Sequence, residues 1–467
     1  MKKCLTLLFI LIFLLSGCQK KEPTYKKEIN IEGSIFTGTK DSVVSTELVF
    51  DDAWITSEDN TVFNTDLAKV AAILSTDSYF REKDLEKGSQ NRVLLVDSEE
   101  DYDYSLLFKA LGFDDVEHIE SFKQKYYEYD TNDSVTMNLG YKNVDDKYDT
   151  FIVVIRGCFS AGEWTTIYDS GANDSSYGDA TGNHPEWNSK DIHKGIDVAV
   201  NRAKEFIDEF VNSHDTDRPN TMLLTGHSRG GTIANILGSE LEESDYAKMY
   251  TYTFNAMKAT MNSSDSKTVF NIFDSNDFFT DLLPFKNEKF ERNGTDICED
   301  IAGNDEIKSI INKIKKVDNY DCVSKEFLDN YRIMFEDMFI DRNSLYELKT
   351  IEKEFDEKSL AQEKYDELLS LTDGSHLGLD GIMSISNIEE VDGKYCFKIE
   401  YNNATVLRGL SKIFTYGEAA NDGLQTLFEE DNKACELYTL VTNNISKLNG
   451  AHYIINDYAI IENYHKS

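Results

Sequence analysis

The chain has 467 residues and carries 48 basic against 85 acidic side chains, which gives a formal net charge of −37 at pH 7. With 40% hydrophobic and 12% aromatic residues, the composition is that of a folded protein with a sizeable core and not of a disordered chain. Nucleic-acid binding needs Lys and Arg to displace the counterions of phosphates, so the acidic balance argues against a nucleic-acid partner. The same charge would be repelled by an anionic membrane surface.

The N-terminus offers another route to a membrane. Two lysines precede an apolar run over residues 4–15, which is shorter than the ~20 residues that a transmembrane helix needs and is typical of an export signal. The run ends in LSGC at residues 15–18, which resembles the lipobox of bacterial lipoproteins. The resemblance implies cleavage before Cys18 and a lipid on its thiol, so that the protein is anchored to the extracytoplasmic face of the cell membrane. The alternative is an ordinary signal peptide that contains a cysteine.

The chain divides by composition into several regions. We expect a signal peptide over residues 1–17 and a polar, lipidated tether over 18–40. Residues 41–284 and 441–467 are expected to form one α/β domain. The charged and mostly helical pattern of residues 285–440 predicts an insertion or lid region that packs over the edge of the sheet or its active face.

Helices and strands alternate along the α/β domain. Apolar periodicity and continuous apolar runs predict, in chain order, a helix over 64–80, a strand over 91–97, a helix over 106–111, a strand over 150–156, a helix over 192–212, a strand over 221–225, a helix over 230–241, and strands over 251–254 and 268–273. Continuous runs such as TFIVVIR at 150–156 are typical of strands buried on both faces. The order predicts a mainly parallel sheet flanked by helices, the α/β fold class.

The motif G-x-S-x-G occurs at residues 226–230, between a predicted strand and a predicted helix. This context is the one in which the motif forms a nucleophile elbow, where a strained turn projects a serine above the sheet. The glycines lack a Cβ, so strand and helix can approach each other closely around Ser228. The backbone N–H of Arg229, at the start of the helix, would face negative charge that develops on a substrate.

Together with other segments, this motif resembles the class 3 lipases, a family with the α/β-hydrolase fold. The resemblance rests on residues 152–158, 163–164 with 168–169, 193–195, 224–231, 252–256, 276–277 and 283–284. It implies that Ser228 is the nucleophile and that Asp277 is the acid. Asp277 follows the strand predicted at 268–273, as this fold requires, and Asp274 and Asp281 are nearby alternatives.

The resemblance also implies an oxyanion hole made by the backbone N–H groups of Cys158 and Arg229. The sequence departs from the family pattern at both positions. Cys158 stands where Thr or Ser is usual, so a hydroxyl donor is lost while the backbone donor remains. Arg229 stands where Leu is commoner, which leaves its backbone role unchanged.

The catalytic histidine is found by elimination. The order Ser, Asp, His along the chain leaves His376, His452 and His465. His465 is so close to the C-terminus that fraying would spoil its geometry. His452 lies in a turn before an apolar C-terminal segment, where the family carries its histidine, and we favour it. His376 lies in a loop of the insertion and is the alternative.

These residues predict a serine carboxylic-ester hydrolase, such as a triacylglycerol lipase, phospholipase or carboxylesterase, that acts on an ester or lipid substrate through an acyl-enzyme. The alternatives are a non-catalytic surface lipoprotein that uses the hydrolase fold for binding, and another acyl-transfer reaction served by the same triad. No cysteine pair has C-x-x-C spacing, and the acidic loop at 169–188 fits no metal-binding pattern, so we expect no metal. We also expect no cofactor and a monomer.

Overall fold

The structure is a computed structural model. It describes residues 24–38, 42–80, 91–96, 103–120, 135–158, 163, 192–214, 216–241, 246–281, 290–315, 324–340, 344, 347–369, 383–403, 405–406, 410, 413 and 431–464. The predicted signal peptide, Cys18, the acidic loop at 169–188, His376 and His465 lie outside the described residues.

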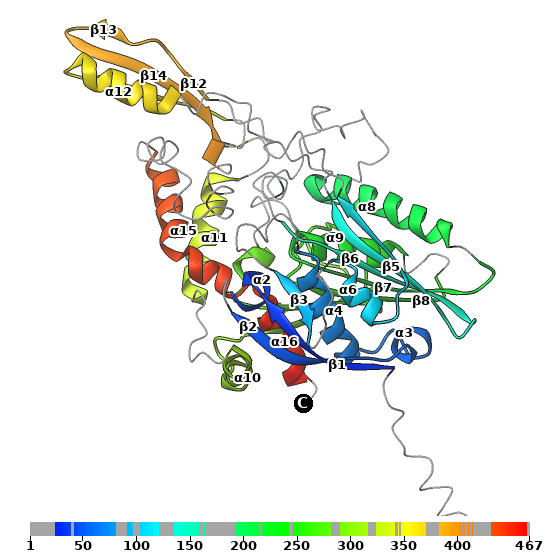
Figure 1. The fold of residues 1–467 in the computed structure, drawn as a ribbon. Coiled ribbons are helices and arrows are strands. Elements are labelled where there is room, and N and C mark those ends of the chain that lie inside the picture. The colour runs from blue at the N-terminus through cyan, green and yellow to red at the C-terminus, as the bar shows by residue number, and fades with distance from the viewer. Residues whose placement is uncertain are drawn as a thin grey trace, which may run out of the picture.

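A sheet of seven strands forms the centre of the molecule (Figure 1). From one edge to the other the strands are β10 (Thr295–Glu299), β9 (Val269–Asp274), β8 (Lys248–Phe254), β7 (Asn220–His227), β6 (Tyr148–Ile155), β5 (Thr136–Val144) and β4 (Asp115–Glu120). The strands from β6 to β10 pair in parallel, whereas β5 and β4 pair antiparallel. The sheet is therefore mainly parallel, as the sequence predicts.

Helices cover both faces of this sheet (Figure 1). The helices of one face are α8 (Lys194–Ser213) and α9 (Arg229–Leu241), and those of the other are α4 (Thr65–Asp77), α10 (Asp305–Lys315) and α16 (Ile454–Tyr464). Strand β6 shows why a continuous apolar run is needed, because successive side chains point to opposite faces. Val153 and Ile155 enter the core beside α8 and α9, while Ile152 and Val154 enter the core beside α4 and α16. This arrangement is an α/β-hydrolase-like fold.

The predicted helices and strands of the α/β domain are confirmed to within a few residues. Helix α4 begins where Asn64 caps it, since the Asn64 side chain accepts a hydrogen bond from the Leu67 N–H at 2.9 Å. The predicted strand at 91–97 forms as β3 (Arg92–Leu95), but it lies in a separate small sheet. The predicted helix at 106–111 forms as α6 (Leu106–Ala110).

The N-terminal segment differs from the tether expected over residues 18–40. Residues Tyr25–Glu32 form β1, which pairs antiparallel with both β2 (Val43–Phe50) and β3. Ile29 and Ile31 of β1 are fully buried. The segment is polar in composition, but its apolar residues alternate, so one face packs on the core while the other stays in water. Two short helices, α2 (Ser34–Thr37) and α3 (Ala53–Thr56), follow β1 and β2.

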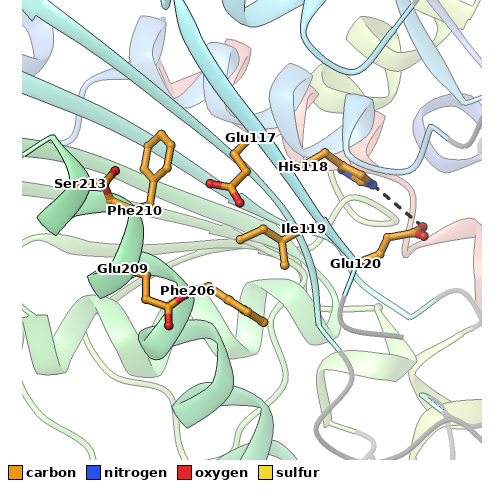
Figure 2. Close-up of a pocket in the computed structure, with 8 residues that line it drawn as sticks. All are labelled: Glu117, His118, Ile119, Glu120, Phe206, Glu209, Phe210 and Ser213. Carbon is orange, nitrogen blue, oxygen red and sulfur yellow. Dashed lines mark hydrogen bonds and ion pairs between the residues drawn. The ribbon is translucent and has the colours of Figure 1, made fainter. Parts of the chain in front are cut away.

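A cavity of about 400 Å³ opens between the edge strand β4 and helix α8. Figure 2 shows Glu117 and Ile119 of β4 turned toward Phe206 of α8. No residue of the predicted catalytic set lines this cavity. It therefore belongs to the edge of the sheet and not to the site described below.

The insertion begins later than predicted, and it contains an antiparallel sheet besides the expected helices. Strand β10 and helix α10 lie before it, because β10 pairs with β9 as the edge strand of the central sheet. The elements that follow are α11 (Lys325–Met338), β11 (Leu348–Phe355), α12 (Lys358–Leu369), β12 (Met383–Ile385), β13 (Glu389–Val391), β14 (Lys394–Asn402) and α15 (Asn432–Gly450). Strand β14 is the centre of an antiparallel sheet that projects from the main body together with α12 (Figure 1).

Strand β14 is an exception to the mostly helical pattern that the sequence predicts for this region. Phe397, Ile399 and Tyr401 are buried, and they alternate with charged residues along the strand. A strand that buries one face carries an alternating pattern, which a search for continuous apolar runs does not detect.

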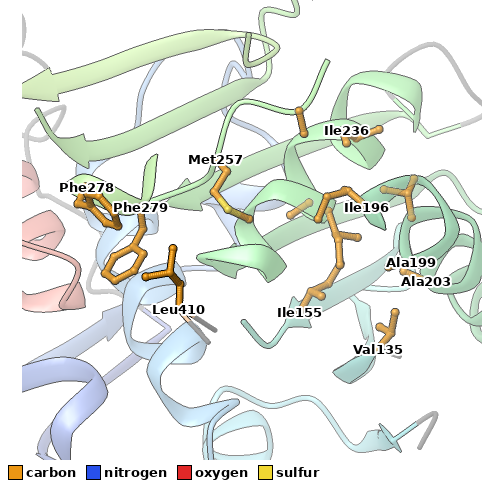
Figure 3. Close-up of a cluster of buried hydrophobic side chains, with 14 of the residues drawn as sticks. Val135, Ile155, Ile196, Ala199, Ala203, Ile236, Met257, Phe278, Phe279 and Leu410 are labelled. Carbon is orange, nitrogen blue, oxygen red and sulfur yellow. The ribbon is translucent and has the colours of Figure 1, made fainter. Parts of the chain in front are cut away.

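The insertion shares a core with the central domain. Figure 3 shows Leu410 beside Phe278 and Phe279, which follow directly after Asp277 in the chain. The ring of Phe278 also meets that of Tyr331, on α11, edge-on at a centroid distance of 4.2 Å. The insertion therefore packs against the segment that carries the predicted catalytic acid.

Among the residues that the structure describes, no helix combines the length and apolar character needed to cross a bilayer.

Candidate active site

Ser228 occupies the turn between β7 and α9, the strand–turn–helix context that its motif requires. Its φ angle is 58°, in the left-handed region that a residue with a side chain rarely adopts. The turn is held by a hydrogen bond of 2.8 Å from the Ser228 N–H to the carbonyl oxygen of Phe254. A Cβ on Gly230 would collide with the backbone of Ile155 and Arg156, so a glycine is required there. The geometry is that of a nucleophile elbow.

The segment after β6 passes close to the elbow, as an oxyanion hole at Cys158 requires. A Cβ on Gly157 would lie 3.0 Å from the Cβ of Ser228 and 2.6 Å from the carbonyl oxygen of His227. Only glycine permits this approach, and Cys158 is the next residue. Arg229 is the first residue of α9, so its N–H belongs to the positive end of the helix. The structure thus brings both predicted oxyanion residues beside Ser228.

A buried ion pair fixes the chain directly after β6, at residues 156–158. Arg156 Nη2 lies 3.1 Å from Glu163 Oε1, and the side chains are 2% and 1% exposed. Arg156 lies two residues before Cys158, so the pair anchors the chain next to the predicted oxyanion residue. A paired and buried guanidinium of this kind holds its neighbours in one geometry, because breaking the pair would leave a buried charge.

Asp277 and His452 form the pair that the sequence predicts. The Nδ1 of His452 lies 2.7 Å from Oδ2 of Asp277, whose side chain is fully buried. The other oxygen of Asp277 accepts a hydrogen bond from the Phe279 N–H at 2.9 Å. Asp274 is engaged elsewhere, since it accepts hydrogen bonds from Asn276 and from the Ile301 N–H. The side chain of Asp281 lies outside the described part of the structure.

The second nitrogen of His452 is available for a proton. His452 lies in the turn between α15 and α16, and its Nε2 is buried without a hydrogen-bond partner among the described residues. Because Nδ1 donates to Asp277, Nε2 carries the lone pair of the neutral ring. The ring centroid lies 4.7 Å from that of His227, the residue before Ser228. No hydrogen bond joins Ser228 to Nε2 in this structure, and such bonds often tighten only when substrate binds.

His227 of the elbow also contacts the turn that bears His452. Its Nε2 donates a hydrogen bond of 2.9 Å to the carbonyl oxygen of His452, and its Nδ1 accepts one of 2.9 Å from the hydroxyl of Tyr79. Burial, followed by the nearby His452, places the pKa of His227 well below its ordinary value. A neutral His227 therefore links the elbow to the backbone of the predicted catalytic histidine.

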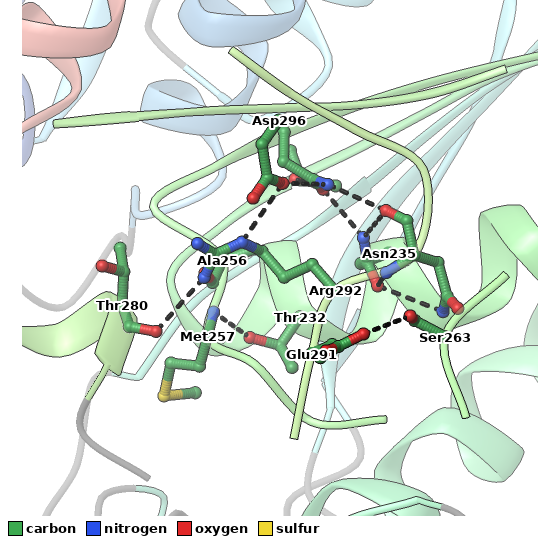
Figure 4. Close-up of polar contacts among 12 residues, drawn as sticks. Thr232, Asn235, Ala256, Met257, Ser263, Thr280, Glu291, Arg292 and Asp296 are labelled. Carbon is green, nitrogen blue, oxygen red and sulfur yellow. Dashed lines mark hydrogen bonds and ion pairs between the residues drawn. The ribbon is translucent and has the colours of Figure 1, made fainter. Parts of the chain in front are cut away.

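A second polar cluster fixes the loop that carries Asp277. Arg292 Nη1 donates to the carbonyl oxygens of Ala256 and Thr280, at 3.0 and 3.2 Å (Figure 4). The guanidinium also lies over the ring of Phe273, 4.0 Å from its centroid. Arg292 thus ties the turn after β8 to the 3₁₀ helix Phe278–Asp281 that follows Asp277.

Sequence reasoning missed several residues that contact this site. They are Tyr79, Asn255, Arg292 and Asp457. Their contacts at the site join residues from different parts of the chain, so no local sequence pattern marks these roles. Among the described residues, no cluster of His, Cys, Asp and Glu is suited to hold a metal ion.

Comparison with known proteins gives a likeness in fold. No protein-family model matches the chain, and no curated protein matches its sequence. Among solved structures, the chain is similar to the Lip2 lipase of Yarrowia lipolytica, with 16% identity, a TM-score of 0.31, and coverage of 49% of this chain and 77% of that one. It is also similar to the triacylglyceride lipase of Rhizomucor miehei, with 14% identity, a TM-score of 0.32, and coverage of 51% and 80%. It is similar as well to lipase II of Rhizopus niveus, with 16% identity, a TM-score of 0.28, and coverage of 47% of this chain and 75% of that one. The likeness concerns the fold alone.

Proposed function

We propose that the protein is a serine carboxylic-ester hydrolase of the lipase or esterase type. One observation carries the proposal: the elbow that holds the strained Ser228 contacts His452 through His227, and the Nδ1 of His452 binds a buried carboxylate while its Nε2 has no partner among the described residues. A buried ring nitrogen without a partner costs free energy. Proton transfer to and from Ser228 would give this nitrogen a role.

The mechanism follows from the arrangement. His452 Nε2 takes the hydroxyl proton as Ser228 Oγ attacks the ester carbonyl, and Asp277 stabilises the imidazolium. The N–H groups of Cys158 and Arg229 hold the negative oxygen of the tetrahedral intermediate. The ester C–O bond then breaks, the alcohol leaves with the proton from His452, and an acyl-enzyme remains. Water attacks this acyl group through the same steps, which releases the carboxylic acid.

The insertion would form part of the substrate site. Its helix α11 contacts Phe278 through Tyr331, next to the predicted acid. An acyl or alcohol group that reaches Ser228 would therefore pass close to this insertion, which makes the insertion the element that selects substrates.

The proposed location is the outer face of a membrane, held by a lipid on Cys18. The resemblance to a lipobox supports it. Strand β1 begins at Tyr25, so residues 18–24 alone would link the lipid to the folded body. Even a fully extended link of this length spans only ~25 Å. The body would lie close to the bilayer, where ester lipids are at hand.

Active-site labelling tests the proposal. The wild-type protein should react with a fluorophosphonate probe and hydrolyse at least one member of a panel of p-nitrophenyl esters, a triglyceride and a phospholipid, and Ser228→Ala should do neither. A wild-type protein that is folded but neither labelled nor active would instead be a non-catalytic binding protein. Cleavage of a peptide or thioester, with no ester cleaved, would indicate another acyl-transfer reaction.

A further inference from the structure

The residue after strand β8, Asn255, has an unusual backbone and a fully buried side chain. Its φ angle is 50°, a conformation that glycine adopts freely and that Asn and Asp tolerate best among other residues. Its N–H donates to the carbonyl oxygen of Ile272 at 3.0 Å, and none of its surface is exposed. Glycine could adopt this backbone conformation, so the conformation alone does not explain why the residue is an asparagine.

That side chain joins the predicted catalytic turn to the last helix. Asn255 Nδ2 donates one hydrogen bond of 3.2 Å to the carbonyl oxygen of His452 and another of 2.8 Å to Oδ2 of Asp457. The carbonyl oxygen of His452 also accepts the hydrogen bond from His227. Two side chains at the ends of neighbouring parallel strands, β7 and β8, therefore converge on a single backbone atom of the histidine.

Asp457 completes the arrangement from the first turn of α16. It is fully buried, and the burial, together with the charges of Asp277 and Asp274, raises the pKa of Asp457 well above its ordinary value. Burial therefore favours the neutral form of this carboxyl group. A neutral carboxyl can accept the amide hydrogen bond without placing a further negative charge beside Asp277.

We propose that Asn255 and Asp457 are positioning residues, which hold the turn bearing His452 so that its Nε2 points toward Ser228. This inference rests on the proposed hydrolase function. The hydrogen bond to Asp277 fixes one atom of the ring and leaves rotation about that bond open. The hydrogen bonds from Asn255 to the carbonyl oxygen of His452 and to Asp457 form a clamp, which fixes the backbone of the same histidine. A displacement of about 1 Å in such a group can cost about 100-fold in rate.

Asn255→Gly is the sharpest test, because glycine keeps the left-handed backbone and removes only the amide. With p-nitrophenyl butyrate as substrate, we expect kcat to fall by roughly 10- to 100-fold while KM changes by less than about 2-fold. The rate of fluorophosphonate labelling should fall in parallel. Asp146→Gly is the matched control, since Asp146 also has a positive φ of 53° but lies in the exposed turn between β5 and β6. It should leave every value unchanged.

Two variants at Asp457 test the other half of the clamp, even if Asn255→Gly fails to fold. Asp457→Asn keeps a neutral acceptor oxygen of the same shape and should keep kcat within about 3-fold of wild type. Asp457→Ala removes the acceptor and should lower kcat as Asn255→Gly does. The double variant Asn255→Gly with Asp457→Ala should be no slower than the slower single variant, because both substitutions break one clamp.

The outcomes separate this inference from the function on which it rests. An active wild type whose kcat and labelling rate survive Asn255→Gly would overturn the positioning role alone. Equal losses in Asp457→Asn and Asp457→Ala would do the same. A folded wild type that is neither labelled nor active would overturn both proposals.

Discussion

The Nδ1 of His452 lies 2.7 Å from Oδ2 of Asp277, although 175 positions separate the two residues in the chain. The carboxylate comes from the loop after β9, the strand next to the edge strand β10, and the histidine from the turn before the last helix. His452 lies beside the elbow of Ser228, since it contacts His227, and Asp277 follows the end of a parallel strand. In open α/β sheets, ligands bind at this end of the strands.

Removing the hydroxyl of Ser228 should abolish turnover. Ser228→Ala should lower kcat by about 10⁴- to 10⁶-fold on any ester that the wild type cleaves, because no other described hydroxyl occupies the elbow. The melting temperature should not fall, since Ser228 is strained and alanine does not remove a packing group. Steady-state kinetics and differential scanning calorimetry would check both parts. Residual activity above about 1% of wild type would point to another nucleophile.

Asp277 and Asp274 should respond differently to the same substitution. Asp277→Asn should lower kcat by about 10⁴-fold with little change in stability, because the amide no longer holds the histidine in its working tautomer. Asp274→Asn should instead lower the melting temperature, since Asp274 accepts hydrogen bonds from Asn276 and from the Ile301 N–H. Kinetics and thermal unfolding of the two variants would be compared. The opposite pattern would make Asp274 the catalytic acid.

A hydroxyl at position 158 should strengthen the oxyanion hole. Cys158→Thr would place a donor beside the developing charge, and we expect kcat to rise by up to about 10-fold with KM nearly unchanged. Cys158→Val is the matched control, because valine has the shape of threonine without its hydroxyl, and it should show no gain. If both variants gain or lose equally, the side chain at this position acts through its shape and not through a hydrogen bond.

The buried carboxyl of Asp457 should make stability depend on pH. Its pKa is raised well above 3.8 in the folded state, so the unfolded chain releases this proton at a lower pH than the folded protein does. The free energy of unfolding should therefore decrease as pH rises from about 4 toward the raised pKa. Between the two pKa values, release of this one proton lowers the free energy of unfolding by up to about 1.4 kcal/mol per pH unit.

Asp457→Asn removes this titration and should flatten the pH dependence. The variant should gain stability relative to the wild type between pH 5 and 8 and show no gain below pH 4. Urea unfolding at several pH values would measure the difference. A difference that stays constant with pH would mean that Asp457 is ionised in the folded protein.

The proposed lipid anchor predicts a change of compartment. When the full chain is expressed in a bacterium, Cys18→Ser should move the protein from the membrane pellet to the soluble or secreted fraction and stop the incorporation of labelled palmitate. Cys298→Ser is a suitable control, since Cys298 lies on the exposed strand β10. If the wild type takes up no label, the N-terminus acts as an ordinary signal peptide or as no signal at all.

Local patterns of this sequence predicted the α/β class and the elbow. Continuous apolar runs mark strands that are buried on both faces, and G-x-S-x-G between a strand and a helix marks the serine turn. Chain order and position favoured Asp277 and His452, and the structure brings these two together. It leaves the alternative His376 outside the described residues.

Three strands could not be predicted from local patterns, because they depend on pairing or packing partners that are distant in the chain. Strand β1 looked like a polar tether, and β14 looked like part of a helical insertion, because each buries only one face. Strand β10 has few apolar residues and becomes part of the central sheet only through its pairing with β9.

Sequence alone predicted the nucleophile elbow, since this turn needs particular residues at short spacing, and steric limits on the backbone act over that same short range. Tertiary structure alone decided which groups surround the histidine. His227 and Asn255 reach the carbonyl oxygen of His452, and Tyr79 and Asp457 bind these two side chains, because strands and helices far apart in the chain pack there.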